Sequence, residues 1–254
     1  GPTASTWHSG RACWRLAAKL PSAMPANTPA TPPAFSPAAL ARCVPFAVFM
    51  ALLALRGYLP PSLGLDARWI YGAQAVIVAG LLAWYWRDYG ELVRQTLPYA
   101  REAGWAVVVG IAVFAVWVQL DAPWMQLGSA TAPFVPLDAD GHLIWPLVLL
   151  RLTGAALVVP VMEELFWRSF LMRWVQHPRF ERVDPQTVGP KAIVVSTFIF
   201  TLAHTLWLAA VIAGLAYAWL YRRTGKLCTA VIAHMVTNAL LGVWVIATGR
   251  WEFW

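Results

Sequence analysis

Long apolar runs alternate with short polar segments along most of this chain. They cover residues 39–55, 69–86, 103–120, 152–172 and 227–247. A helix needs roughly 20 apolar residues to cross the hydrocarbon core of a bilayer, and each run is close to that length. The pattern therefore predicts an all-α fold, a polytopic membrane helix bundle.

A further stretch, 192–221, carries no Asp, Glu, Lys or Arg, and its length fits neither one span nor two. One straight helix of this length would measure about 45 Å, whereas two full spans need about 40 residues. We expect two short, tilted helices that form a short or broken hairpin, and about seven to eight transmembrane helices in total. Backbone that turns at membrane depth persists only inside protein or beside a wet cavity, so a water-accessible pocket is also predicted.

Composition supports a membrane protein. Of the 254 residues 59% are hydrophobic and only 12% are charged, and the mean hydropathy is +0.58. A soluble globular domain carries about 25% charged residues, so a soluble enzyme is excluded. The 16 tryptophans agree with this, because tryptophan gathers at membrane–water interfaces.

The apolar pattern divides the chain into three parts. Residues 1–38 are rich in proline and alanine, which predicts a disordered segment. Its first two residues, Gly-Pro, resemble the scar of tag cleavage, with Met24 as a candidate native start. We expect N-terminal transmembrane helices in 39–142 and a catalytic transmembrane core in 143–254.

The net charge of +7 reflects orientation in the bilayer rather than nucleic-acid binding, because the basic residues lie mainly between the apolar runs. Segment 121–142 holds three aspartates and neither Lys nor Arg. The positive-inside rule then places the N-terminus and the basic loops in the cytoplasm. Those loops contain Arg87, Arg94 and Arg101; Arg173, Arg179, Arg182 and Lys191; and Arg222, Arg223 and Lys226.

Three ionisable residues interrupt the run 152–172: Glu163, Glu164 and Arg168. A charged group at the centre of a membrane helix costs at least about 2.5–3.5 kcal/mol, so such residues are rare and usually functional. Glu164 and Arg168 are four residues apart, on one helix face, where they can form an ion pair. Glu163 is rotated by about 100° from Glu164, so the two carboxylates cannot do the same job.

Later runs add three polar side chains, His204, His234 and Asn238. Counting about 1.5 Å per residue from the nearest basic loop places all the candidate residues in one band, in the cytoplasmic half of the bilayer. A buried histidine or a Glu–Arg pair alone is more often structural, but the convergence of the whole set favours function. A carboxylate that takes a proton from water, with His and Asn donors for an oxyanion, would suit peptide hydrolysis.

Three motifs occur in order: EExxxR as EELFWR (163–168), FxxxH as FTLAH (200–204) and HxxxN as HMVTN (234–238). Together with the segment GLAYAWLYRRTGKL (214–227) they resemble the type II CAAX prenyl endopeptidases and their bacterial relatives, the CPBP or Abi group. The resemblance covers about 150–245. Ser169 stands where many members have glycine, and Trp167 where many have phenylalanine.

The resemblance implies a glutamic intramembrane endopeptidase without a cofactor. Glu163 with His204 would activate water, His234 and Asn238 would form the oxyanion site, and Glu164 and Arg168 would support it. The spacing alone leaves open which glutamate is the base.

The resemblance also implies that the substrate is a membrane-inserted or lipidated peptide. We expect the protein to lie in a bacterial inner membrane. The strings EELFWRSFLMRW and TGRWEFW further resemble an exosortase-associated subgroup of CAAX protease-related proteins.

Two other classes of function use the same residues. A zinc metalloprotease would bind its ion through Glu163, His204 and His234, with water as the fourth ligand. It would lack the HExxH motif, however, and asparagine is a poor zinc ligand. A proton-coupled transporter would use Glu and His as a relay, but the chain shows no internal repeat of the kind that transporters commonly contain. A non-catalytic membrane scaffold is the remaining alternative.

Overall fold

The computed structural model describes residues 36–58, 66–128 and 133–254. The predicted disordered segment therefore lies almost wholly outside the described residues. Within them the fold is all-helical, as predicted, and five helices are long and apolar enough to cross a membrane. Besides short 3-10 helical turns, the described ranges contain seven longer helices: α1 (Pro37–Tyr58), α2 (Ala67–Trp84), α3 (Ala100–Trp117), a long helix (Trp145–Gln176), α7 (Pro190–Leu202), α8 (Trp207–Thr224) and α9 (Leu227–Thr248).

The long helix is a composite of α-helical and π-helical segments. It contains α4 (Trp145–Thr153), α5 (Val159–Glu164) and α6 (Arg173–Gln176), joined by π-helical turns at Gly154–Val158 and Leu165–Met172. Short π-helical turns within α-helices are rare and frequently mark functional sites. Here they flank the two adjacent glutamates, Glu163 and Glu164.

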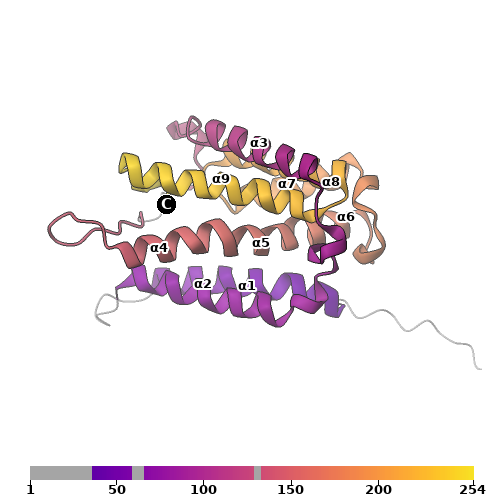
Figure 1. Ribbon diagram of the computed structural model, residues 1–254, viewed down its shortest axis with the longest axis horizontal. Helices are drawn as coiled ribbons and strands as arrows, with labels where there is room; N and C mark the ends of the chain where they lie inside the picture. The colour runs from indigo at the N-terminus through magenta and orange to yellow at the C-terminus, as the bar shows by residue number, and fades with distance from the viewer. Residues whose placement is uncertain (1–35, 59–65, 129–132) are drawn as a thin grey trace, which may run out of the picture. The chain divides into compact units, whose positions relative to one another are not determined.

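Figure 1 shows how the long helix is surrounded. Its α4 and α5 sections run between the α1–α2 pair and α9, while α9 also packs against α3 and α8. The α3–α9 crossing depends on Gly110, because a Cβ at this position would lie 2.5 Å from the carbonyl oxygen of Ala233. This close approach fixes the position of α9, which carries His234 and Asn238.

The segment 192–221 forms the predicted hairpin, as α7 and α8. Its turn contacts the connection between α3 and α4: Leu127 donates a backbone hydrogen bond to the Thr205 carbonyl (2.7 Å), and the Trp207 indole donates to the Trp124 carbonyl (3.1 Å). The helix α7 has only 13 residues and is about 20 Å long. It ends at Leu202, so His204 lies just beyond its end. The hairpin turn is thereby held at the end of the bundle where α3 ends.

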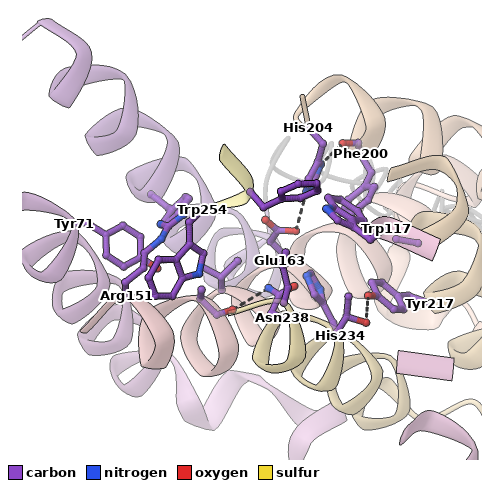
Figure 2. Close-up of a pocket in the computed structure, with 17 residues that line it drawn as sticks. Tyr71, Trp117, Arg151, Glu163, Phe200, His204, Tyr217, His234, Asn238 and Trp254 are labelled. Atoms are coloured by element: carbon purple, nitrogen blue, oxygen red, sulfur yellow. Dashed lines mark hydrogen bonds and ion pairs between the residues drawn. The ribbon is translucent and has the colours of Figure 1, made fainter. Parts of the chain in front are cut away.

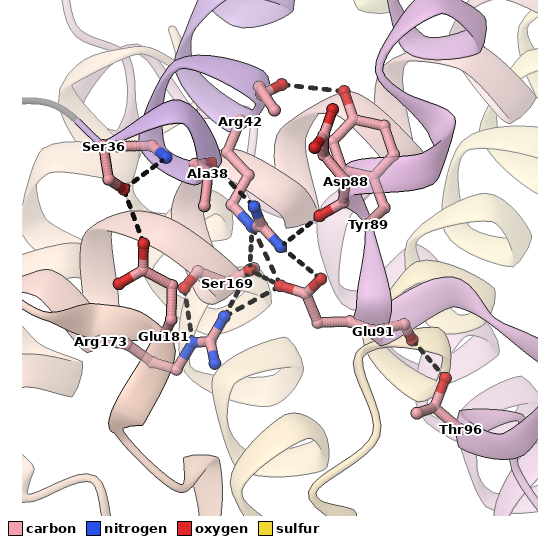
Figure 3. A network of polar contacts seen from close by, with 12 residues as sticks. Ser36, Ala38, Arg42, Asp88, Tyr89, Glu91, Thr96, Ser169, Arg173 and Glu181 are labelled. Carbon is pink, nitrogen blue, oxygen red and sulfur yellow. Dashed lines mark hydrogen bonds and ion pairs between the residues drawn. The ribbon is translucent and has the colours of Figure 1, made fainter.

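A polar network ties α1 and the α2–α3 connection to the long helix (Figure 3). At its centre Glu91 accepts from Arg42 (2.5 Å), from Arg173 (2.9 Å) and from the hydroxyl of Ser169. Arg42 also donates to the Ser169 hydroxyl at 2.8 Å. The Ser169 hydroxyl therefore joins three elements that are distant in the chain.

Candidate active site

The two adjacent glutamates face different neighbours. Glu164 is fully buried, and its Oε1 accepts from Arg168 Nη1 (3.1 Å) and from His234 Nδ1 (2.9 Å). Glu163 lines a cavity, where its Oε2 lies 4.0 Å from His204 Nε2. That Oε2 is buried and has no hydrogen-bond partner among the described residues. One residue step turns a helix by about 100°, which separates the two environments.

His204 is oriented by the residue four positions earlier. Its Nδ1 lies 2.8 Å from the Phe200 carbonyl oxygen. Because a carbonyl oxygen can only accept, Nδ1 carries the proton of this bond, and Nε2 is the ring atom that faces Glu163. The Phe200 ring also lies against the imidazole, with centroids 4.2 Å apart, and Trp117 packs edge-on at 6.0 Å.

His234 is held between a carboxylate and an aromatic ring. Its Nδ1 is bonded to Glu164, and the Tyr217 ring stacks on the imidazole with centroids 4.9 Å apart. The Tyr217 hydroxyl donates to Thr237 at 2.8 Å, which fixes the position of the ring. Tyr217 was not among the residues singled out from the sequence. Its only sequence signal is its place within the segment 214–227.

Asn238 contacts the backbone of the first π-helical turn. Its Nδ2 donates to the Ala155 carbonyl at 2.9 Å. That carbonyl lacks a helical donor, because the Val159 N–H bonds to Gly154 instead and Pro160 has no N–H. Asn238 therefore satisfies a carbonyl group left over by the π-helical turn, and the second hydrogen of its amide remains for another acceptor in the cavity that it lines.

Arg168 connects the site to the α7–α8 hairpin. Besides its ion pair with Glu164, its Nη2 donates to the Gly214 carbonyl (3.3 Å). The guanidinium also lies over the rings of Phe200 (4.6 Å) and Tyr217 (5.4 Å). It is 3% exposed, so its charge is fully enclosed by these partners.

Four of the six residues expected from the sequence line one cavity of about 230 Å³: Glu163, His204, His234 and Asn238 (Figure 2). Glu164 and Arg168 lie behind it. The cavity continues along the long helix to Arg151, Tyr71 and Trp254. The pocket predicted from the awkward length of 192–221 is thus present, lined in part by polar groups.

The zinc hypothesis names Glu163, His204 and His234 as ligands, and the side chains that cluster as possible metal ligands are different ones. Within the described part of the chain, one group of three ligating side chains has donor atoms within 4.8 Å of one another, and it is Asp138, Asp140 and His142, all exposed. His234 already uses its Nδ1 for Glu164, which leaves only Nε2 for another partner.

Residues 145–240 match a family model described as type II CAAX prenyl endopeptidase, Rce1-like. The matched segment begins with the long helix and ends two residues beyond Asn238, so it includes all three motifs. No curated protein and no solved structure matches the chain.

Proposed function

We propose that this protein is an intramembrane protease that hydrolyses a peptide bond with a water molecule held between Glu163 and His204. The match of residues 145–240 to the Rce1-like type II CAAX prenyl endopeptidases supports this proposal. The chain is a multi-pass membrane protein. The substrate of such a site is a membrane-inserted or lipidated peptide that reaches the cavity from within the bilayer.

One observation carries the proposal: the buried, unpartnered Oε2 of Glu163 lies 4.0 Å from Nε2 of His204. This distance is too long for a direct hydrogen bond but allows one water to bond to both atoms. With Nδ1 of His204 committed to Phe200, both Nε2 and Oε2 act as acceptors. The water donates its two hydrogens to them, and an oxygen lone pair is left to attack the substrate carbonyl.

The second histidine and Asn238 serve the opposite side of the reacting carbonyl. Arg168 and His234 both face the carboxylate of Glu164. A protonated His234 donates from Nδ1 to Glu164 and from Nε2 into the cavity. Nε2 and the free amide hydrogen of Asn238 then stabilise the oxyanion that forms as water adds.

The proton balance is complete with these groups. As the oxygen–carbon bond forms, Glu163 takes one proton from the attacking water. Glu163 then delivers that proton to the leaving nitrogen as the carbon–nitrogen bond breaks, which yields a carboxylic acid and an amine. No step requires a metal ion, so we expect activity to persist in strong chelator and without stoichiometric zinc in the purified protein.

The proposed orientation follows the distribution of basic residues, with the N-terminus on the cytoplasmic side of a bacterial inner membrane. Glu163 and Asn238 lie near the middle of the long helix and of α9. The reaction would therefore occur close to mid-membrane depth. This is slightly deeper than counting from the basic loops suggests.

The test is a comparison of membrane proteomes from cells that express the native chain, Glu163→Gln or His204→Ala. We expect new peptide termini in membrane proteins with the native chain and their loss, by about 100-fold or more, with either variant. Glu102→Gln is the matched control, since Glu102 also lies on a transmembrane helix but pairs with Lys226 at 2.7 Å, away from the cavity. Unchanged processing by Glu163→Gln at equal protein levels would refute the proposal. A proton-coupled transporter without protease activity would produce no new peptide termini even with the native chain.

A further inference from the structure

A second charged group enters the cavity from the end opposite His204. The guanidinium of Arg151, on α4, lies over the ring of Tyr71 at 4.3 Å and over that of Phe134 at 5.5 Å. Both aromatic side chains are buried. Arg151 thus lies within the bundle and lines the cavity.

Arg151 has no counterion in the described part of the chain. Among the described residues no carboxylate forms an ion pair with it, and its Nε is buried without a hydrogen-bond partner. Residues 1–35, 59–65 and 129–132 contain no Asp or Glu, so no side-chain carboxylate comes from there either. By contrast, the buried arginines Arg42 and Arg168 are paired with glutamates.

The local charge is more positive still because of α1. Arg56, in the last turn of α1, is close enough to Arg151 for the two charges to repel each other. Placing an unpaired cation among aromatic rings inside a membrane bundle is costly. Arg151 is only partly buried, but its Nε is buried without a partner. A guanidinium with such a donor, lining the cavity that also holds the candidate catalytic groups, is suited to a planar anion.

We propose that Arg151 binds a carboxylate of the peptide substrate and so determines specificity. This inference rests on the proposed function. Arg151 and Glu163 lie on the same helix, twelve residues apart, which is about 18 Å along its axis. An extended peptide covers about 3.3 Å per residue, so the carboxylate lies within about five residues of the cleaved bond. It is either the terminal carboxylate or that of an Asp or Glu side chain.

Binding measurements on the full chain with Glu163→Gln, which prevents turnover, test this assignment. The first probe pair is N-acetyl-Leu-Val-Leu as the free acid and as its C-terminal amide. The second pair is N-acetyl-Leu-Glu-Leu amide and its glutamine counterpart. We expect the acid of at least one pair to bind about 10- to 100-fold more tightly than its neutral partner, the range of a charge-assisted hydrogen-bond pair. The pair that shows the difference identifies the source of the carboxylate.

Substitution then assigns the preference to Arg151. With Arg151→Gln the acid-to-amide ratio should fall to about one while the neutral probe binds as before, and Arg151→Lys should retain part of the ratio. Arg250→Gln is the matched control, because Arg250 is paired with Asp121 and Glu252 and does not line the cavity. Three results would each overturn the inference. They are equal binding of acid and amide, an equal loss of binding of both probes in Arg151→Gln, and no binding of either acid at millimolar concentration. Because the readout is binding, its failure is distinct from a failure of cleavage in the Glu163 experiment.

Discussion

Glu163 and Glu164 are adjacent in the chain but differ in what holds them. Glu164 has two cationic or protonatable neighbours, Arg168 and His234, within 3.1 Å of one oxygen. Glu163 has an unpartnered oxygen in a cavity. Glu164 also has an oxygen without a partner, Oε2, but Glu164 does not line the cavity. A carboxylate enclosed by its partners serves to stabilise and orient them, whereas one with a free oxygen in a cavity is available to bind water. The environment of each glutamate thus supports the division of roles that spacing could not decide.

This difference predicts unequal effects of the two glutamates on stability. Glu164→Ala leaves Arg168 and His234 buried without their shared carboxylate, which should lower the free energy of unfolding by about 3–5 kcal/mol. Glu163→Gln removes a carboxylate oxygen that makes no hydrogen bond among the described residues, so it should change stability by less than about 1 kcal/mol while abolishing cleavage. Thermal unfolding of both variants in the same detergent measures this. Similar losses in the two variants would contradict the assigned roles.

At the scale of elements, the π-helical turns and Pro160 explain why α9 has an asparagine at the site. The turn at Gly154–Val158 leaves the Ala155 carbonyl without a helical donor, and Asn238 supplies one. The bond fixes the amide of Asn238 relative to the helix that carries Glu163. An irregular helix and a polar residue on its neighbour therefore form one structural unit.

The α3–α9 crossing is the second feature at this scale and yields a matched pair of variants. Gly110→Ala would place Cβ 2.5 Å from the Ala233 carbonyl and 2.8 Å from Val236 Cβ, so α9 must shift. We expect a loss of about 1–3 kcal/mol, with reduced cleavage because His234 moves with α9. Gly104→Ala, on the same helix with nothing within 4 Å of its Cβ, should be neutral or stabilising by up to about 1 kcal/mol. Unfolding temperatures and cleavage assays of the pair test the crossing, and equal behaviour would argue against it.

At the scale of the whole molecule, the network around Glu91 connects the matched segment 145–240 to the helices before it. Glu91 lies between α2 and α3, outside the membrane-spanning segments. Burial by itself would raise the pKa of its carboxyl, but Arg42, Ser169 and Arg173 together hold that pKa below its ordinary value. The carboxylate form therefore joins α1, the α2–α3 connection and the long helix.

The lowered pKa gives a signed dependence of stability on pH. Below the ordinary glutamate pKa of about 4.3, the unfolded chain binds a proton that the folded protein does not. The contribution of Glu91 is thus fully present above that pH and is lost as the pH falls through the lower pKa of the folded state. We expect the unfolding temperature to drop from pH 6 to pH 3 and the drop to be smaller in Glu91→Gln, which should already be less stable at pH 6. Thermal unfolding across this range measures it, and an unchanged slope in Glu91→Gln would contradict the role of the network.

The sequence determined the membrane location, the all-helical fold, most helix boundaries and the hairpin of α7 and α8, because hydrophobicity and chain length are properties of continuous segments. It also identified the three motifs whose residues meet in the structure. The partners of Glu163 and Glu164, the π-helical turns, the stacking of Tyr217 and the unpaired charge of Arg151 depend on which side chains from distant segments come together. That is decided by helix packing, so only the tertiary structure assigned one glutamate to a cavity and the other to an ion pair.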